Sequence, residues 1–151
     1  MKGKRGDWGM SLMEMLLVVA LLALLSVGGL SLYSQSLRRA RDSRRLADMN
    51  ELGLVLDNYL GDNGCYPESL IVNQCGGTGL RPYLDAVSCD PTDNDLFRYK
   101  YVRENCKTYR IYLRLENETN ELIDKMGCRE GCGPGADKSF NYFVTSGNVV
   151  E

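Results

Sequence analysis

The stretch that decides the fold is Met15-Leu16-Leu17-Val18-Val19-Ala20-Leu21-Leu22-Ala23-Leu24-Leu25. It lies in a run of 23 uncharged residues between Glu14 and Arg38. At about 1.5 Å per residue, a helix of this length matches the hydrocarbon core of a bilayer, which is roughly 30 Å thick. A secretory signal peptide is the alternative, but its apolar region is shorter, and Ser26-Val27-Gly28-Gly29 is a weak cleavage site. We therefore expect residues 10–36 to form a retained transmembrane helix.

The helical pattern continues beyond the apolar run. Leu52, Val55, Leu56 and Tyr59 recur at the spacing of an amphipathic helix, and the first proline is Pro67. The sequence Gly61-Asp62-Asn63-Gly64 is typical of a helix end followed by a turn. We expect the amphipathic half of one long helix to cover residues 37–60, with a connecting loop over residues 61–98.

The last part of the chain, residues 99–151, is expected to hold an antiparallel sheet and C-terminal loops. Residues 109–116 alternate most clearly between apolar and polar side chains, and 97–102 and 140–145 are the other expected strands. A sheet of about three strands has one apolar face that needs a cover, and the amphipathic half-helix supplies one. The predicted fold class is α+β: a long N-terminal helix packed on a small antiparallel sheet, with loops joined by disulfides.

All six cysteines follow the predicted helix. An even number of cysteines in a small, loop-rich region predicts a disulfide framework in an oxidising compartment. A structural zinc site would need two closely spaced pairs, and only Cys128 and Cys132 are close. Joining sequence neighbours, one of about 15 possible connectivities, predicts these pairs: Cys65–Cys75, Cys89–Cys106 and Cys128–Cys132.

The charges that flank the apolar run conflict with the placement of the cysteine-containing region in an oxidising compartment. Three Lys or Arg residues precede the apolar run and five follow it, in the cluster Arg38, Arg39, Arg41, Arg44 and Arg45. The positive-inside rule alone would place the C-terminal domain in the cytoplasm. We give more weight to the six cysteines, which would have no use as thiols there.

The amino-acid composition of the chain excludes several functions. A chain with no His cannot build a Ser-His or Cys-His nucleophile pair or a His-ligated metal site, so we expect no enzyme, no cofactor and no metal. The net charge of -2 gives no basic excess for nucleic-acid binding. The arginine cluster is a candidate contact with lipid headgroups or an acidic neighbouring subunit, and DNA phosphates are the less favoured alternative. The acidic segment 90–95 lacks the Gly and the terminal Glu of an EF-hand loop, so a turn is expected rather than a calcium site.

The N-terminus, from Lys2-Gly3-Lys4-Arg5 to Gly9 and on through Met10-Ser11-Leu12-Met13-Glu14, resembles the type IV prepilin and pseudopilin family. Members of that family carry a short basic leader ending in Gly, an apolar first mature residue, and Glu at the fifth mature position. The later sequence Asp62-Asn63-Gly64-Cys65-Tyr66-Pro67 is similar to the helix exit of these proteins. Met10 replaces the usual Phe. Gly28-Gly29 stands where many members have Pro, and we expect the helix to melt there on assembly.

The resemblance implies a mechanism. Residues 1–9 would be a leader that a prepilin peptidase removes between Gly9 and Met10, before methylating the amine of Met10. Glu14 would then pair with the N-terminus of a neighbouring subunit, since a buried carboxylate needs a partner.

The implied function is that of a pilin, the structural subunit of a type IV pilus-like filament. Such a chain spans the cytoplasmic membrane once, with its C-terminal domain outside, and contacts lipids and an inner-membrane assembly platform. It then polymerises with itself into an extracellular or periplasmic filament. Within the family, a major pseudopilin of type II secretion or a DNA-uptake subunit remains open. From another class, the alternative is a membrane-anchored binding domain that never polymerises.

Overall fold

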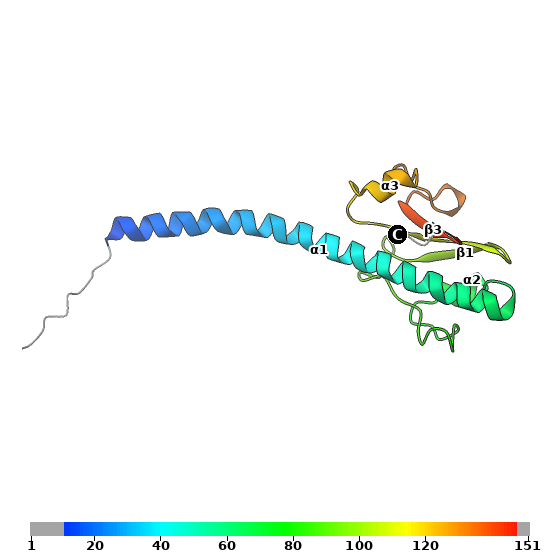
Figure 1. Cartoon of the computed structure of the whole chain (residues 1–151). Helices are drawn as coiled ribbons and strands as arrows, with labels where there is room; N and C mark the ends of the chain where they lie inside the picture. Colours follow the sequence, from blue (N-terminus) through cyan, green and yellow to red (C-terminus); the bar gives the residue numbers. More distant parts are fainter. Residues whose placement is uncertain (1–10, 148–151) are drawn as a thin grey trace, which may run out of the picture. The chain divides into compact units, whose positions relative to one another are not determined.

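The computed structural model describes residues 11–147, apart from the side chains of residues 27–32 and 136 (Figure 1). The chain divides into two compact units, of which the first ends at Leu37 and the second begins at Arg38. A single α-helix, α1 (Leu12–Asn63), supplies residues to both units.

The first unit consists of the start of α1. The carbonyl of Ser11 accepts the first helical N–H bonds, from Glu14 at 3.0 Å and Met15 at 3.2 Å. The backbone stays α-helical through Gly28 and Gly29, whose surroundings lie outside the described residues. Among the described residues, no helix offers a stretch that is both long and apolar enough to cross a membrane. The transmembrane segment expected over residues 10–36 is therefore not supported.

The second unit combines the rest of α1 with a three-stranded sheet. The strands β1 (Lys100–Asn105), β2 (Thr108–Leu113) and β3 (Tyr142–Thr145) are antiparallel, in the order β1-β2-β3. Three short helical turns complete the unit: α2 (Ser69–Val72), α3 (Glu121–Lys125) and the 3-10 turn η1 (Pro134–Ala136). The predicted α+β class, with a helix packed on an antiparallel sheet and disulfides in the loops, is confirmed.

The core of the second unit lies between α1 and the sheet. On α1 it includes Leu52 and Leu56 of the predicted amphipathic stripe, together with Met49. These side chains belong to one buried cluster with alternate residues of the strands, Tyr109, Ile111, Leu113, Tyr142 and Val144. Alternation in the strands and a 3.6-residue period in the helix thus produce one shared apolar layer.

The first two strands are displaced from their expected positions. β1 begins at Lys100 rather than at Phe97, because the Phe97 ring lies 4.7 Å from the Arg45 guanidinium and the Tyr99 hydroxyl donates to Asp48 at 2.7 Å. β2 ends at Leu113, although Leu115 is also buried. Beyond that point the side-chain amide of Asn141 pairs with both the N–H and the carbonyl of Leu115. A side chain therefore replaces the backbone partner that would have continued the strand.

The helix end and the following loop also differ in detail. α1 ends at Asn63, three residues later than expected, and Gly64 leaves it with φ +73° while its N–H bonds to the Leu60 carbonyl at 2.8 Å. The expected loop over 61–98 contains the short helix α2. After α2, the Asn73 side chain pairs with the backbone N–H and carbonyl of Tyr101, so the loop is fastened to β1.

Candidate functional site

The first unit exposes an apolar helix surface. Its large side chains are 40–79% exposed, so no part of the described chain covers them. These residues are Leu12, Met13, Met15, Leu16, Leu17, Val18, Val19, Leu21, Leu22, Leu24 and Leu25. They lie on every side of the helix, which is the distribution of a helix that is surrounded by apolar partners. We call residues 12–25 the apolar half-helix.

Glu14 is the one carboxylate on the apolar half-helix. It is exposed, and within the described residues it has no hydrogen-bond or ion-pair partner. Its position in the first turn places its negative charge beside the free backbone N–H groups of the helix start, which is a favourable arrangement. The predicted processing residues, Gly9 and Met10, lie outside the described residues.

The five clustered arginines divide into two groups. Arg45 is completely buried and Arg41 is half-buried, and both are bound to carboxylates of the same chain. Arg38, Arg39 and Arg44 are exposed and have no partner among the described residues. The prediction of a five-residue contact cluster is therefore wrong for Arg41 and Arg45, because their guanidinium groups are already engaged inside the fold.

All five N–H groups of the Arg45 guanidinium have an acceptor. Nε and Nη2 donate to the two oxygens of Asp90, at 2.7 and 2.9 Å. Nη1 donates to Asp42 and to Glu116, both at 2.8 Å, and Nη2 also donates to Thr92 Oγ1 at 2.9 Å. Because Arg offers five donors, this network satisfies the group completely. We call Arg41, Arg45, Asp42, Asp90 and Glu116 the ion network.

The acidic members of the ion network join three segments of the chain. Asp42 accepts the backbone N–H groups of Glu116 and Asn117, both at 2.9 Å, and so holds the segment after β2 against α1. Glu116 also accepts hydrogen bonds from Nε and Nη2 of Arg41, at 2.6 and 2.5 Å. Asp90 comes from the loop between α2 and β1. The network thus fixes α1 to two loops that are far apart in sequence.

The electrostatics of the network lower two carboxyl pKa values. Burial alone would raise the pKa of Asp90, but the hydrogen bonds from Arg45 and Thr92 outweigh it and leave that pKa below its ordinary value. The pKa of Glu116 is lowered first by the hydrogen bond from Arg41, against the effect of burial, and further by Arg45. Both carboxyl groups are therefore held in their charged form at neutral pH.

Sequence reasoning missed the ion network, although a signal for it was present. Arg45 lies four, seven and eleven positions before Met49, Leu52 and Leu56, so it shares the buried face of the helix. A charged residue in phase with a buried stripe must be paired. Its partner Asp90 belongs to the acidic segment 90–95. The Asp90 carboxylate accepts from Arg45 and also from the backbone N–H of Thr92, which closes a turn.

The disulfide connectivity differs from the prediction in two of three pairs. Cys65 is joined to Cys106, and Cys75 to Cys89, whereas Cys128–Cys132 is as predicted. The β1–β2 turn lies beside the helix exit, where the N–H of Tyr66 donates to the Cys106 carbonyl at 3.0 Å. Cys75 and Cys89 close the loop that lies between them. Two backbone hydrogen bonds close the same loop, from the N–H of Gly76 to the Val87 carbonyl and from the N–H of Val87 to the Gly77 carbonyl. Sequence proximity therefore failed as a guide because the hairpin folds back onto the helix.

One cysteine group has the composition of a metal site. Among the described residues, Cys75, Cys89 and Asp93 bring their ligand atoms within 4.8 Å of one another. The two sulfur atoms are joined in a disulfide, so neither is a thiolate, which is the form that binds metal.

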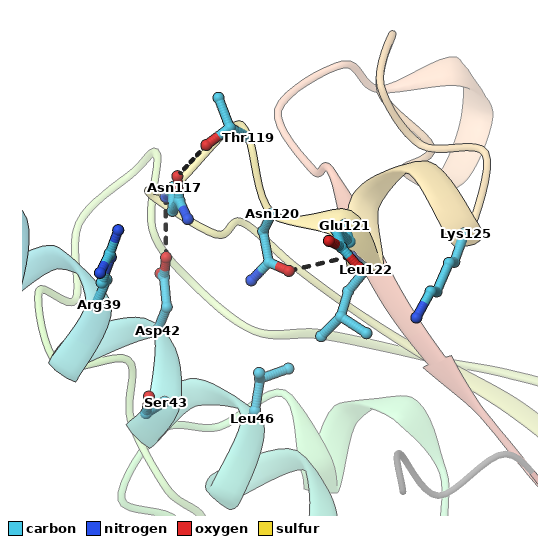
Figure 2. Close-up of a pocket in the computed structure, with 10 residues that line it drawn as sticks. All are labelled: Arg39, Asp42, Ser43, Leu46, Asn117, Thr119, Asn120, Glu121, Leu122 and Lys125. Atoms are coloured by element: carbon cyan, nitrogen blue, oxygen red, sulfur yellow. Dashed lines mark hydrogen bonds between the residues drawn. The ribbon is translucent and has the colours of Figure 1, made fainter.

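A groove of about 480 Å³ lies between α1 and the segment that leads into α3. Figure 2 shows the residues that line it. The α1 wall carries Arg39, Ser43 and Leu46, and the opposite wall ends at Lys125. Most polar atoms between them already have partners: Asp42 accepts from Asn117, Asn117 accepts from Thr119 at 2.8 Å, and the N-cap residue Asn120 accepts from Leu122 at 3.1 Å. The groove is therefore a satisfied polar surface, with two cations at its rim.

The comparisons with known proteins give no match: no family model fits the chain, and no curated protein or solved structure is similar to it.

Proposed function

We propose that this chain is a pilin-like structural subunit of an extracytoplasmic filament. The observation that carries the proposal is the apolar half-helix, which is exposed on every side and bears a single unpaired carboxylate, Glu14. Burying one Leu side chain contributes about 1.5–3 kcal/mol, so a helix with this surface is strongly driven to acquire apolar partners. The N-terminal sequence indicates which partners these are, namely lipids before assembly and the same helix of other subunits afterwards.

Glu14 gives the assembly a register. A carboxylate that enters an apolar bundle must find a cation, because an unpaired buried charge costs several kcal/mol. Cleavage after Gly9 would create a positively charged amine on Met10, four residues from Glu14. In a staggered bundle, the amine of one subunit can reach the carboxylate of the next. The contact joins different groups on the two copies, so it repeats into an open polymer.

The test is the fate of the Glu14→Ala variant in cells that contain a prepilin peptidase. Filaments are sheared from the surface, sedimented, and measured as non-reduced intact mass. We expect the wild type to sediment and to start at Met10, one methyl group heavier and six hydrogens lighter. Glu14→Ala should be cleaved to the same mass but should not sediment. Glu121→Ala, an exposed carboxylate in the second unit, is the matched control and should sediment normally.

Two results would contradict the proposal. A wild-type chain that keeps Met1 and stays in the membrane would favour the anchored binding domain. Normal filaments from Glu14→Ala would remove the role of that carboxylate.

A further inference from the structure

The segment between β2 and α3 contains the tripeptide Asn117-Glu118-Thr119. Asn117 is the one asparagine of the chain that is followed, two positions later, by Ser or Thr. The pattern Asn-X-Ser/Thr, in which X is not Pro, is the acceptor for N-linked sugars on the surface of exported proteins. So short a pattern also occurs by chance, so the geometry around Asn117 has to decide whether it is a modification site.

The tripeptide forms an exposed turn. The N–H of Asn120 donates to the Asn117 carbonyl at 3.0 Å, and Glu118 and Thr119 lie exposed at the tip of the turn that this bond closes. The backbone N–H of Asn117 donates to Asp42 at 2.9 Å, which holds the base of the turn on α1. A modifying enzyme can therefore reach this turn from solvent, and a group attached to it would have a firmly held base.

The Thr119 hydroxyl sets the orientation of the Asn117 amide. It donates to Oδ1 at 2.8 Å, and the oxygen is the end of an amide that accepts (Figure 2). Nδ2 therefore points elsewhere, and it has no hydrogen-bond partner in the described part of the chain. Nor is it enclosed, because the side-chain polar atoms that are buried without a partner in that part are Asn50 Oδ1 and Thr108 Oγ1. The nitrogen that would carry a sugar is thus free and open to solvent.

Asparagines with a structural role use their amides differently. The Asn141 amide bonds through both its nitrogen and its oxygen to the backbone of Leu115. The Asn73 amide does the same with Tyr101. Among the residues that the structure describes, the side chain of Asn117 bonds only to the hydroxyl that completes the acceptor pattern. Its amide nitrogen therefore has no structural use in the fold.

The groove of about 480 Å³ lies beside the acceptor, and Asn117 is one of its lining residues. Arg39, Ser43 and Lys125 line it too, and they are exposed, with no hydrogen-bond partner in the described ranges. Guanidinium, hydroxyl and ammonium groups are hydrogen-bond donors, and the hydroxyl and ring oxygens of a sugar are acceptors. The groove therefore offers both room and donors to the first sugar attached to Asn117.

We propose that Asn117 is an N-glycosylation site, modified at Nδ2 with an oligosaccharide from a polyprenyl-diphosphate donor. Nδ2 attacks the anomeric carbon of the first sugar, so that a C–N bond forms and the C–O bond to the diphosphate breaks. The polyprenyl diphosphate leaves, and Nδ2 gives one proton to a base of the transferase, so the step needs no oxidant or reductant. This inference rests on one part of the proposed function, the extracytoplasmic placement of the second unit, and does not require a filament.

The test is the mass of one tryptic peptide. Trypsin cuts after Arg114 and Lys125 and so releases peptide 115–125, which contains Asn117 and Thr119 and no cysteine. The chain is purified from native cells, both from the membrane and from sheared surface material. We expect the wild-type peptide to be heavier than its sequence by one or more sugar residues, and fragmentation should place the added mass on Asn117.

Four full-length variants identify the modified atom. Asn117→Gln moves the amide and Thr119→Val removes the hydroxyl with little change of shape, so both should lose the added mass. Thr119→Ser keeps the hydroxyl and should keep the sugar. Asn120→Asp is the matched control, because it removes the other amide of the peptide but keeps an oxygen that can cap α3, and it should also keep the sugar. All four retain the backbone bond from residue 117 to Asp42, so we expect them to fold.

The outcomes separate this inference from the proposed function. An unmodified peptide 115–125 from a wild-type chain that starts at Met10 and has oxidised cysteines would overturn the glycosylation site alone. A sugar that persists in Asn117→Gln would also overturn it, because the sugar would then be on the Thr119 hydroxyl. A chain that keeps Met1, stays reduced and carries no sugar would contradict both proposals. A glycosylated chain that forms no filaments would overturn the filament function alone.

Discussion

Arg45 on α1 donates two hydrogen bonds to the Asp90 carboxylate, of 2.7 and 2.9 Å, although the two residues are 45 positions apart in sequence. Both side chains are fully excluded from solvent. Bidentate Arg–carboxylate pairs are among the strongest polar contacts in proteins, and this one is surrounded by three further acceptors. The pair therefore determines where the long loop before β1 lies on the helix.

Removing the guanidinium should be severely destabilising. Arg45→Ala leaves Asp90, Asp42 and Glu116 without their shared cation, and breaking a buried pair in this way costs about 3–5 kcal/mol. Arg44→Ala, one position earlier and exposed, should change the free energy of unfolding by less than about 0.5 kcal/mol. Denaturant unfolding of the two variants measures the difference. Equal midpoints would mean that the network contributes nothing to stability.

The ion network should also make the fold sensitive to acid. The pKa values of Asp90 and Glu116 are lowered in the folded chain, so both groups add stability above their ordinary values of 3.8 and 4.5 and lose it as the pH falls further. We expect the free energy of unfolding to decline from about pH 4.5 downward.

The control for this acid effect is the Arg45→Ala variant. Without the guanidinium, Asp90 loses the main hydrogen bonds that keep it ionised, whereas Glu116 keeps the hydrogen bond from Arg41, so the acid decline should be smaller but not abolished. Exposed acidic groups such as Asp124 remain in that variant and set the residual slope. An unchanged acid decline in Arg45→Ala would place the effect outside the network.

The core tyrosines should make the stability of the fold sensitive to base above about pH 10. Burial raises the pKa of Tyr109 to about 12 and raises those of Tyr66, Tyr99 and Tyr101 as well. A raised pKa means that the stabilisation is complete below pH 10, the ordinary value, and is lost as the pH rises beyond it. Tyrosinate absorbance should therefore rise in two phases, the later one coinciding with unfolding. A single step near pH 10 for all nine tyrosines, as in denaturant, would contradict this.

The three disulfides should differ in what they contribute. The separations are 41 residues for Cys65–Cys106, 14 for Cys75–Cys89 and 4 for Cys128–Cys132. By loop-closure entropy, replacing each pair with Ser should cost about 4, 3 and 2 kcal/mol, in that order. Denaturant unfolding of the three double variants checks the ranking, and non-reduced peptide mapping checks the pairs. A peptide linking Cys65 to Cys75 would contradict the connectivity.

The sequence was a good guide wherever a pattern was local. The apolar period of Leu52 and Leu56 and the alternation of residues 109–113 predicted which faces are buried, because both signals come from the geometry of a single element. The same reasoning could not supply the partner of Cys65 or that of Arg45. Those depend on which distant segments the finished fold brings together, and a run of five arginines hides the one that faces inward. For the apolar half-helix, the sequence predicted the helix itself, and the described chain supplies no cover for its side chains.

The joint between Cys65 and Cys106 has a mechanical consequence. It lies two residues beyond the end of α1, while the ion network holds the same helix near residues 41–45. A tensile load along α1 would act on the ionic contacts and on the apolar core between α1 and the sheet, both of which can separate and reform without chemical change. If they give way, the covalent joint keeps the residues between Cys65 and Cys106 from being drawn out as free chain. The disulfide therefore limits how far the chain between these two cysteines can extend under such a load.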